Sequence, residues 1–205
     1  MEIKIIKHQK ARQVRQFAKE AASIHVRTFT GFFLTFLGEG FLTRLYEGFA
    51  KHSDSCLILA VEEEKVVGFL ACSENLSDFY KYLIKTSLIP FAYYSVIAFF
   101  KKPSALFRLL RALTYPSETK TEEKIFEISS IGVLPEAKNK GVGSILLRTV
   151  QETVNFDKFS CIQLETDRDN NDAVNNFYKK NGFVLHETYE TPEGRRMNRL
   201  RYTLN

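Results

Sequence analysis

The order of apolar and polar positions along the chain predicts alternating helices and strands. Segments 11–29 and 39–52 repeat apolar residues every three or four positions, which is the pattern of amphipathic helices. Residues 55–74 form two apolar runs around the charged pair Glu63 and Glu64, as expected for two strands joined by a tight turn. By the same criteria, strands are expected at 2–6, 123–135, 160–166, 183–190 and 197–205, and helices at 142–153 and 170–182. This alternation indicates an α/β fold.

Length and composition narrow the class of protein. At 205 residues, the chain is expected to form one domain, 1–205, that is large enough to bury a core. Hydrophobic residues are 44% of the chain and charged residues 26%, which is typical of a folded protein rather than a disordered one. The net charge of +5 suits an acidic ligand, but no block of lysine and arginine indicates a nucleic-acid partner. The three cysteines and four histidines are scattered, so we expect no disulfide framework, no metal site and a cytoplasmic location.

The stretch PEAKNKGVGSILL, residues 135–147, places two glycines at the start of an apolar helix. A strand that runs into a glycine-containing loop and then into a helix presents free backbone N–H groups and a positive helix end, which suits a phosphate. The phosphate loop G-x-x-x-x-G-K-[ST] does not occur, and Leu146 stands where the dinucleotide motif G-x-G-x-x-G needs its third glycine. On this pattern alone, an anion site and an ordinary structural turn are equal alternatives.

Two motifs make the interpretation more specific. The run VLPEAKNKGVG resembles the acyl-CoA-binding signature of the GNAT superfamily of acetyltransferases, and its matching positions are Val133, Pro135, Lys138, Gly141 and Gly143. About thirty residues later, NNDAVNNFYKKNGF resembles the second motif of that family, in the same order and after an intervening strand. Lys138 stands where the family usually has arginine or glutamine, and it keeps the positive charge. Asn139 stands where glycine is common, and asparagine tolerates a left-handed backbone.

The resemblance implies a GNAT fold: a central mixed, mostly antiparallel sheet that is splayed at the acyl-CoA site, flanked by helices, with a helical insertion between the third and fourth strands. It also implies acetyl-CoA as cosubstrate, with its pyrophosphate on backbone N–H groups of the glycine loop and its pantetheine along the free edge of the preceding strand. The cofactor-binding residues implied in this way are Ile131, Gly132, Val133, Lys138, Asn139, Lys140, Gly141, Val142, Gly143, Ser144, Asn171 and Tyr178. Core packing of Ile131 and Val133 and helix capping by Asn171 are the structural alternatives.

Two residues are candidates for proton transfer. Glu127 lies fourteen residues before Gly141, where some members of the family carry a glutamate general base, and Tyr178 matches the tyrosine that commonly acts as the general acid. Period-two alternation predicts that Glu127, Ser129, Ile131 and Val133 share one face of their strand. The alternatives are a solvated or lysine-paired carboxylate for Glu127 and core packing for Tyr178.

A long segment at about 76–118 is not explained by the motifs. Its residues 76–113 contain one acidic side chain, Asp78, and six basic ones, together with many aromatic side chains. Its apolar stretch between Lys85 and Lys101 has 15 residues and contains Pro90, whereas a membrane-spanning helix needs about 20. Two interpretations remain: a pair of lid helices over the acceptor groove, or a basic, aromatic surface for a membrane or a lipid-linked acceptor.

We therefore expect an N-acetyltransferase that moves acetyl from acetyl-CoA to a primary amine of a small-molecule acceptor by direct attack. An amino-sugar N-acetyltransferase of cell-surface glycan synthesis and a non-catalytic acyl-CoA-binding regulatory module are the alternatives. A protein acceptor, peripheral membrane contact and a homodimer also remain open at this stage, and the sequence does not name the amine or the acyl chain length.

Overall fold

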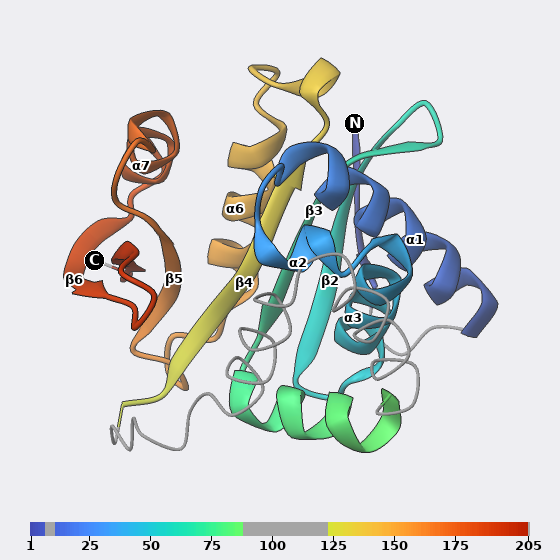
Figure 1. Ribbon diagram of the computed structural model, residues 1–205, viewed down its shortest axis with the longest axis horizontal. Helices are drawn as coiled ribbons and strands as arrows, with labels where there is room; N and C mark the ends of the chain where they lie inside the picture. Colours follow the sequence, from blue (N-terminus) through green and yellow to red (C-terminus); the bar gives the residue numbers. More distant parts are fainter. Residues whose placement is uncertain (7–10, 88–122, 205) are drawn as a thin grey trace.

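The computed structural model describes residues 1–6, 11–87 and 123–204, and within them it shows the predicted order of helices and strands (Figure 1). The strands are β1 (Glu2–Ile6), β2 (Ser55–Glu62), β3 (Lys65–Ser73), β4 (Ile125–Val133), β5 (Cys161–Asp167), β6 (Val184–Glu190) and β7 (Arg196–Tyr202). The helices are α1 (Ala11–Thr28), α2 (Phe33–Phe36), α3 (Glu39–Lys51), the 3₁₀ turn η1 (Pro135–Ala137), α6 (Val142–Thr153) and α7 (Asp172–Lys180). Residues 76–87 are also helical.

The seven strands form one sheet in the order β1-β2-β3-β4-β5-β7-β6. Neighbouring strands are antiparallel except for β4 and β5, which are parallel. Helix α6 connects these two strands, because a parallel pair needs a crossover connection rather than a hairpin. The predicted mixed, mostly antiparallel sheet is therefore confirmed. The predicted helical insertion follows β3 and starts with helical residues 76–87, whereas the rest of it, 88–118, lies outside the described residues.

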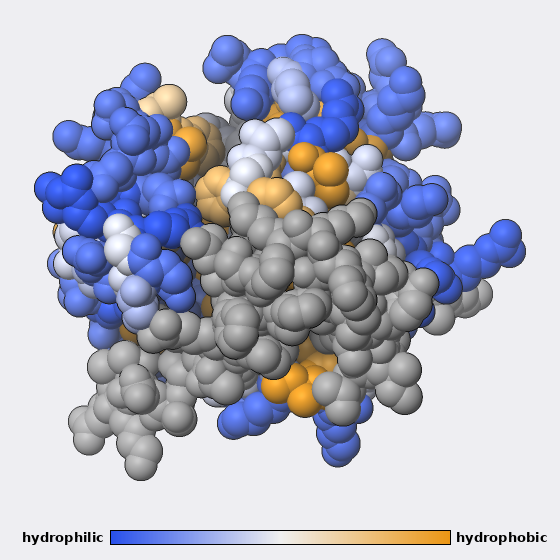
Figure 2. All heavy atoms as spheres, in the orientation of Figure 1, coloured by the Kyte–Doolittle hydropathy of each residue, from blue (hydrophilic) through white to orange (hydrophobic). Residues whose placement is uncertain are grey.

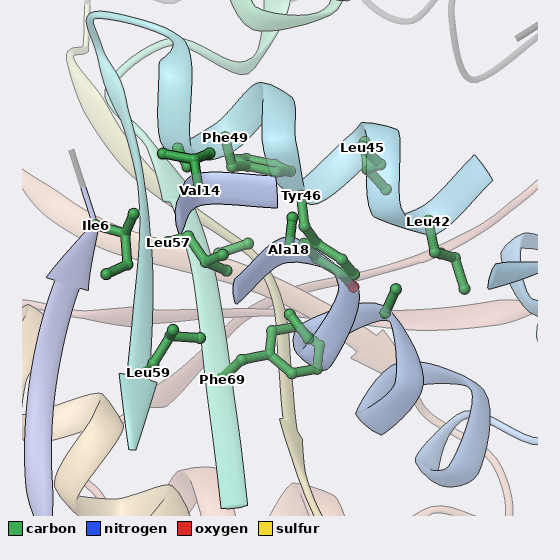
Figure 3. Packing of buried hydrophobic residues seen from close by; sticks show 14 of the residues in the cluster. Ile6, Val14, Ala18, Leu42, Leu45, Tyr46, Phe49, Leu57, Leu59 and Phe69 are labelled. Atoms are coloured by element: carbon green, nitrogen blue, oxygen red, sulfur yellow. The ribbon is translucent and has the colours of Figure 1, made fainter. Parts of the chain in front are cut away.

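Helices cover both faces of the sheet and enclose two apolar clusters (Figure 1). One cluster lies between α1, α3 and the sheet, where Tyr46, Phe49 and Phe69 are fully buried (Figure 3). The other lies between α6, α7 and the opposite face, and includes Leu146 and Leu164. Apolar positions at helical spacing on α1 and alternating ones on β2 and β3 supply these clusters, as the sequence pattern predicts.

The turn between β2 and β3 lies where the sequence predicts it. Glu63 and Glu64 have φ angles of 48° and 66°, so both central residues of the turn are left-handed. A two-residue turn of this kind matches the right-handed twist of the strands that it joins. The four-residue helix α2 and the turn η1 were not predicted, because elements this short show no hydrophobic period.

Among the described residues, no helix is both long enough and apolar enough to cross a lipid bilayer.

Candidate active site

The sheet opens between its two parallel strands. Pairing between β4 and β5 runs only from Ile125 with Cys161 to Ile128 with Leu164, although β4 continues to Val133 and β5 to Asp167. Over the same stretch β4 stays paired to β3 as far as Val133 with Gly68. The second half of β4 therefore has a backbone edge that β5 does not pair with, as the resemblance to the GNAT superfamily implies. Unpaired backbone N–H and C=O groups along such an edge can pair with the amides of a ligand.

A β-bulge in β4 changes which side chains share a face. Ile128 pairs with Cys72 and Ser130 pairs with Ala71, so Ser129 is the additional residue in the strand. The prediction of one shared face is therefore wrong for the set Glu127, Ser129, Ile131 and Val133, because a bulge interrupts the alternation of side chains along the strand. Glu127 shares its face with Ser130 and Gly132, whereas the side chains of Ile131 and Val133 pack into the opposite cluster, next to α6.

The loop after η1 leads into an uncapped helix. Asn139 and Gly141 have φ angles of 62° and 80°, so the asparagine does adopt the left-handed backbone that the sequence permits. Gly141 is the N-cap residue of α6, and no side chain caps that helix. The N–H groups of its first turn, at Val142, Gly143 and Ser144, accordingly have no partner within the helix. With the positive end of the helix dipole, they form a surface that suits an anion.

Gly143 brings this helix end close to the open part of the sheet. A Cβ atom at this position would lie 2.9 Å from Cζ of Phe177 on α7 and 3.8 Å from Cγ2 of Val133 on β4. Glycine thus allows the first turn of α6 to pack between α7 and the second half of β4. The predicted anion-binding loop and the free strand edge are adjacent for this reason.

Glu127 lies on β4 just before the opening, where it pairs with Gln163 on β5 and with Ser73 on β3. Burial, and to a smaller extent the nearby charge of Glu165, raise the pKa of its carboxyl to about 7, although a hydrogen bond from the Leu76 backbone and the charge of Arg199 act in the opposite direction. A carboxyl with a pKa near 7 can accept a proton at neutral pH and still hold it strongly enough to act as a base. Leu76 belongs to the helical segment 76–87, so the insertion begins beside this carboxyl.

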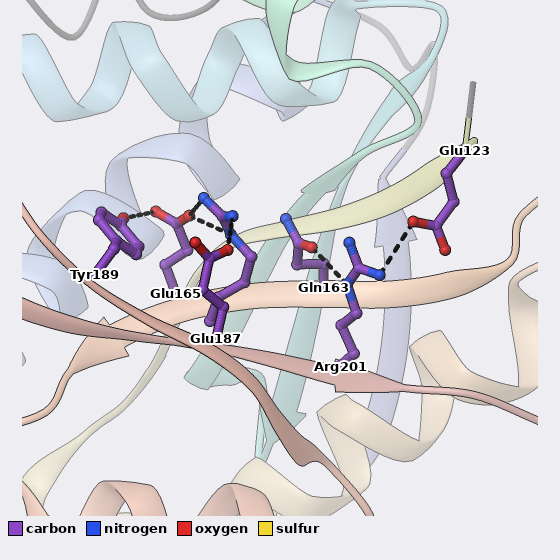
Figure 4. A network of polar contacts seen from close by, with 7 residues as sticks. Glu123, Gln163, Glu165, Glu187, Tyr189 and Arg201 are labelled. Atoms are coloured by element: carbon purple, nitrogen blue, oxygen red, sulfur yellow. Dashed lines mark hydrogen bonds and ion pairs between the residues drawn. The ribbon is translucent and has the colours of Figure 1, made fainter. Parts of the chain in front are cut away.

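A polar network extends from this point along β5, β7 and β6 (Figure 4). Arg199 donates to Glu165 over 3.0 and 3.1 Å and also pairs with Glu187, and the Tyr189 hydroxyl donates to Glu165 over 2.6 Å. Because β5 residues alternate, Glu165 and Gln163 point away from the cluster that holds Leu164, toward the face that carries Glu127. Glu127 therefore lies at the margin of a charged sheet surface, not in the middle of an apolar one.

Tyr178 and Asn171 lie on and just before α7. Tyr178 is 7% exposed and its ring packs against Phe177 and Phe183, and burial raises the pKa of its phenol, so the hydroxyl stays protonated at neutral pH. Asn171 occupies the N-cap position, but its side chain does not cap the helix. Its amide instead donates to Oγ1 of Thr166 and to the Asp167 carbonyl, each over 2.9 Å. The capping alternative is therefore wrong, and Asn171 ties α7 to the end of β5.

Two contacts of the site were missed by sequence reasoning. Arg195, in the turn between β6 and β7, lies 5.6 Å from the ring of Phe32 and also pairs with Asp167 at the end of β5. It thus connects the loop before α2 with the β6–β7 hairpin and the end of β5. Figure 2 shows apolar surface between two hydrophilic regions on one face of the molecule. The second is a hydrogen-bonded chain from His25 through Tyr46 to Ser130. One signal was available for it: His25 continues the stripe of Val14, Ala18 and Ala21 that α1 buries.

Within the described ranges, no group of three or more histidine, cysteine, aspartate or glutamate side chains is placed to hold a metal ion.

The parallel strands β4 and β5 separate next to the start of α6, a helix that no side chain caps and whose N-cap residue is a glycine. This arrangement is the one expected of an acyl-CoA-dependent transferase. The family model described as Acetyltransferase (GNAT) family matches residues 22–183, and the chain belongs to that family. Membership confirms the predicted acetyltransferase class, and with it acetyl-CoA as cosubstrate.

Solved structures with the same fold share little sequence with this chain. An aminoglycoside 6'-N-acetyltransferase complexed with coenzyme A superposes with a TM-score of 0.60 at 12% identity, covering 99% of this chain and 97% of that one. A GNAT acetyltransferase from Streptococcus pneumoniae gives 0.56 at 15% identity, with all of both chains covered. The ribosomal-protein-S18-alanine N-acetyltransferase from Escherichia coli gives 0.57 at 12% identity, covering 100% and 95%. No curated protein matches the chain.

Proposed function

We propose that this acetyltransferase transfers the acetyl group of acetyl-CoA to a primary amine of a small-molecule acceptor by direct attack. The observation that carries the proposal is the raised pKa, about 7, of the half-buried Glu127 carboxyl. This residue lies where β4 separates from β5. A binding module without catalysis has no need of a carboxyl held near neutrality at this point. Shifts of this kind are characteristic of groups that exchange protons during a reaction.

Donor binding is assigned to backbone groups. The N–H groups from Asn139 to Ser144, at the start of α6, receive the pyrophosphate, and the exposed Lys138 and Lys140 add positive charge beside it. The free edge of β4 at Ile131–Val133 pairs with the amides of pantetheine, which directs the thioester toward the opening next to Glu127.

The reaction needs proton transfers at both the attacking amine and the departing thiolate. Glu127 accepts a proton from the ammonium form of the acceptor, directly or through water, and the freed nitrogen lone pair adds to the thioester carbonyl carbon. The C–S bond then breaks, and the departing thiolate takes the proton of Tyr178, whose raised pKa keeps the phenol protonated until that step. The nitrogen of the new C–N bond still carries one proton more than an amide, and it gives that proton to the Tyr178 phenolate, while Glu127 releases its proton to water. The products are the N-acetylated acceptor, coenzyme A and one proton.

The test is the pH dependence of thiol release from acetyl-CoA with a panel of primary amines. For the best amine, kcat/KM of the wild type should rise through about pH 7 as Glu127 ionises. Glu127→Gln should lower the rate at pH 7 by about 100-fold, within the usual range for general-base catalysis, and part of the loss should return at high pH where the amine is already neutral. Glu123→Gln is the matched control, because that exposed carboxylate pairs with Arg201 away from the opening and should leave the profile unchanged. A normal rate for Glu127→Gln at pH 7 would assign the base to another group.

A further inference from the structure

Three polar side chains from three elements form a hydrogen-bonded chain inside the cluster under α1 and α3. Nδ1 of His25 lies 2.6 Å from the Tyr46 hydroxyl, which lies 3.2 Å from Oγ of Ser130. His25 is 3% exposed and Tyr46 is fully buried, whereas Ser130 is half-buried on β4. The chain therefore leads from the apolar interior to the strand that carries Glu127.

The geometry sets the direction of these hydrogen bonds. A separation of 2.6 Å is shorter than the usual range of about 2.7–3.2 Å for an N–H donor to oxygen, but it is normal for a hydroxyl donor. We therefore infer that Tyr46 donates to Nδ1 of His25. The imidazole is neutral at pH 7, because burial lowers the pKa of His25 to about 4, so its single proton is on Nε2.

The other ring nitrogen supports an unusual role for this histidine. Nε2 of His25 is buried and makes no hydrogen bond to any residue that the structure describes. The nearest ring, that of Phe29, has its centroid 4.4 Å from that of His25. A buried side-chain N–H without a hydrogen-bond partner is rare and costly. Packing alone does not explain a histidine here, because an apolar side chain would fill the same space without leaving a polar atom unpaired.

The consequence lies at Ser130. Tyr46 has a single proton, which it gives to His25, so its oxygen accepts the proton of the Ser130 hydroxyl. Toward any other group, the Ser130 oxygen can then only accept a hydrogen bond. Because Ser129 is the bulged residue, Ser130 follows Glu127 on the same face of β4.

We propose that Ser130 accepts a hydrogen bond from the amino group of the acceptor, and that Tyr46 and His25 are positioning residues that keep its hydroxyl proton turned inward. This inference rests on the proposed amine acetylation and extends it. A primary amine has two N–H groups besides its lone pair, and Glu127 and Ser130 supply two acceptors on one face of the strand. Holding both leaves the lone pair free to attack the thioester carbon.

The first experiment needs no acceptor. Nitrogen-15 NMR of labelled wild-type protein should show the His25 proton on Nε2, with Nδ1 unprotonated. A proton on Nδ1 would reverse the direction of the chain, turn the Ser130 proton outward and overturn the inference. This result does not depend on turnover, so it separates failure of the inference from failure of the proposed function.

The second experiment measures thiol release from acetyl-CoA with the best amine of the panel. Ser130→Ala should lower kcat/KM for the amine about tenfold, the value of one ordinary hydrogen bond, while KM for acetyl-CoA stays unchanged. Ser130→Thr, which keeps the hydroxyl, should recover most of the loss. Tyr46→Phe should lower kcat/KM in the wild type but have no further effect in Ser130→Ala, because the two residues act as one unit.

Thr43→Ala on α3 is the matched control, since within the described residues its hydroxyl bonds only to the Glu39 carbonyl of its own helix, and the change should not affect kcat/KM. Additive losses from Ser130→Ala and Tyr46→Phe would contradict the inference, as they indicate two separate structural effects. Unchanged kcat/KM in Ser130→Ala would also overturn it. Absence of turnover by the wild type with every amine would instead contradict the proposed function.

Discussion

At the scale of single residues, Glu127 combines a role in the proposed reaction with a cost to the fold. Its carboxyl is largely removed from water and lies near Glu165, and both effects favour the protonated form and raise its pKa. Arg199, which pairs with Glu165 and Glu187, offsets part of that repulsion. The position of Glu127 beside a charged sheet surface keeps the pKa near neutrality rather than far above it.

This raised pKa predicts how stability depends on pH. A carboxyl with a pKa of about 7 in the folded protein and about 4 when unfolded binds its proton more tightly in the folded state. Its contribution to stability is fully present below about pH 4 and is lost as the pH rises through 7. Relative to the wild type, Glu127→Gln should therefore gain stability from pH 5 to pH 8, measured as the difference between urea unfolding free energies. A constant difference across that range would contradict the raised pKa.

Residue patterns in the sequence pointed to several members of the candidate site. The glycine loop and Glu127 became candidates through their resemblance to the family's motifs, and the left-handed backbone at Asn139 and Gly141 agrees with the residue types. The chain from His25 to Ser130 was not found, because its members are 21 and 84 residues apart and meet only in the folded core. The true contacts of Asn171 were missed because its position suggests a cap, whereas its amide turns back to β5.

At the scale of elements, strand β4 determines the geometry of the opening. Its pairing with β5 ends at Ile128, and the bulge at Ser129 follows immediately. Gly132 then allows close packing: a Cβ atom there would lie 2.6 Å from Cε1 of Phe69 and 3.4 Å from Cγ2 of Ile24 on α1. Helix predictions from periodicity were accurate to one or two residues, but a period of two could not reveal this bulge, which depends on pairing with β3.

Helix α6 provides a direct test of anion binding. Ser144 is the third residue of this uncapped helix. An aspartate there should stabilise the helix through its dipole by about 0.3–1 kcal/mol, yet repel the pyrophosphate. Ser144→Asp should therefore weaken acetyl-CoA binding at least tenfold in calorimetric titrations while the melting temperature stays the same or rises.

Ser144→Asn is the matched control, because it has nearly the same shape without the charge, and it should retain affinity more closely. Equal affinity of the wild type and Ser144→Asp would show that the phosphates bind elsewhere.

At the scale of the whole molecule, the sheet separates two functions. The face under α6 and α7 carries the proposed donor loop, and the face under α1 and α3 carries Glu127, Ser130 and the charged surface along β5 and β7. The opening between β4 and β5 joins the two faces, so the proposed function predicts that donor and acceptor meet there. The Arg195 contact with Phe32 crosses this region from the hairpin to the loop before α2.

Residues 76–87, the described part of the insertion, contact both the apolar cluster and Glu127. Phe79 and Leu83 are buried in the cluster that holds Phe49, and the Leu76 backbone contacts Glu127. This placement favours the lid interpretation for the described part of the segment. The aromatic and basic residues beyond it, on which the membrane interpretation depends, lie outside the described residues.

The most direct test of the account is a crystal structure of the protein with acetyl-CoA. The predicted result places the pyrophosphate oxygens within hydrogen-bond distance of the backbone nitrogens at Asn139–Ser144, and the pantetheine along the β4 edge at Ile131–Val133. The thioester should then lie beside Glu127, within reach of the Tyr178 hydroxyl. A cofactor bound away from the opening between β4 and β5, or with its pyrophosphate far from the start of α6, would contradict the account.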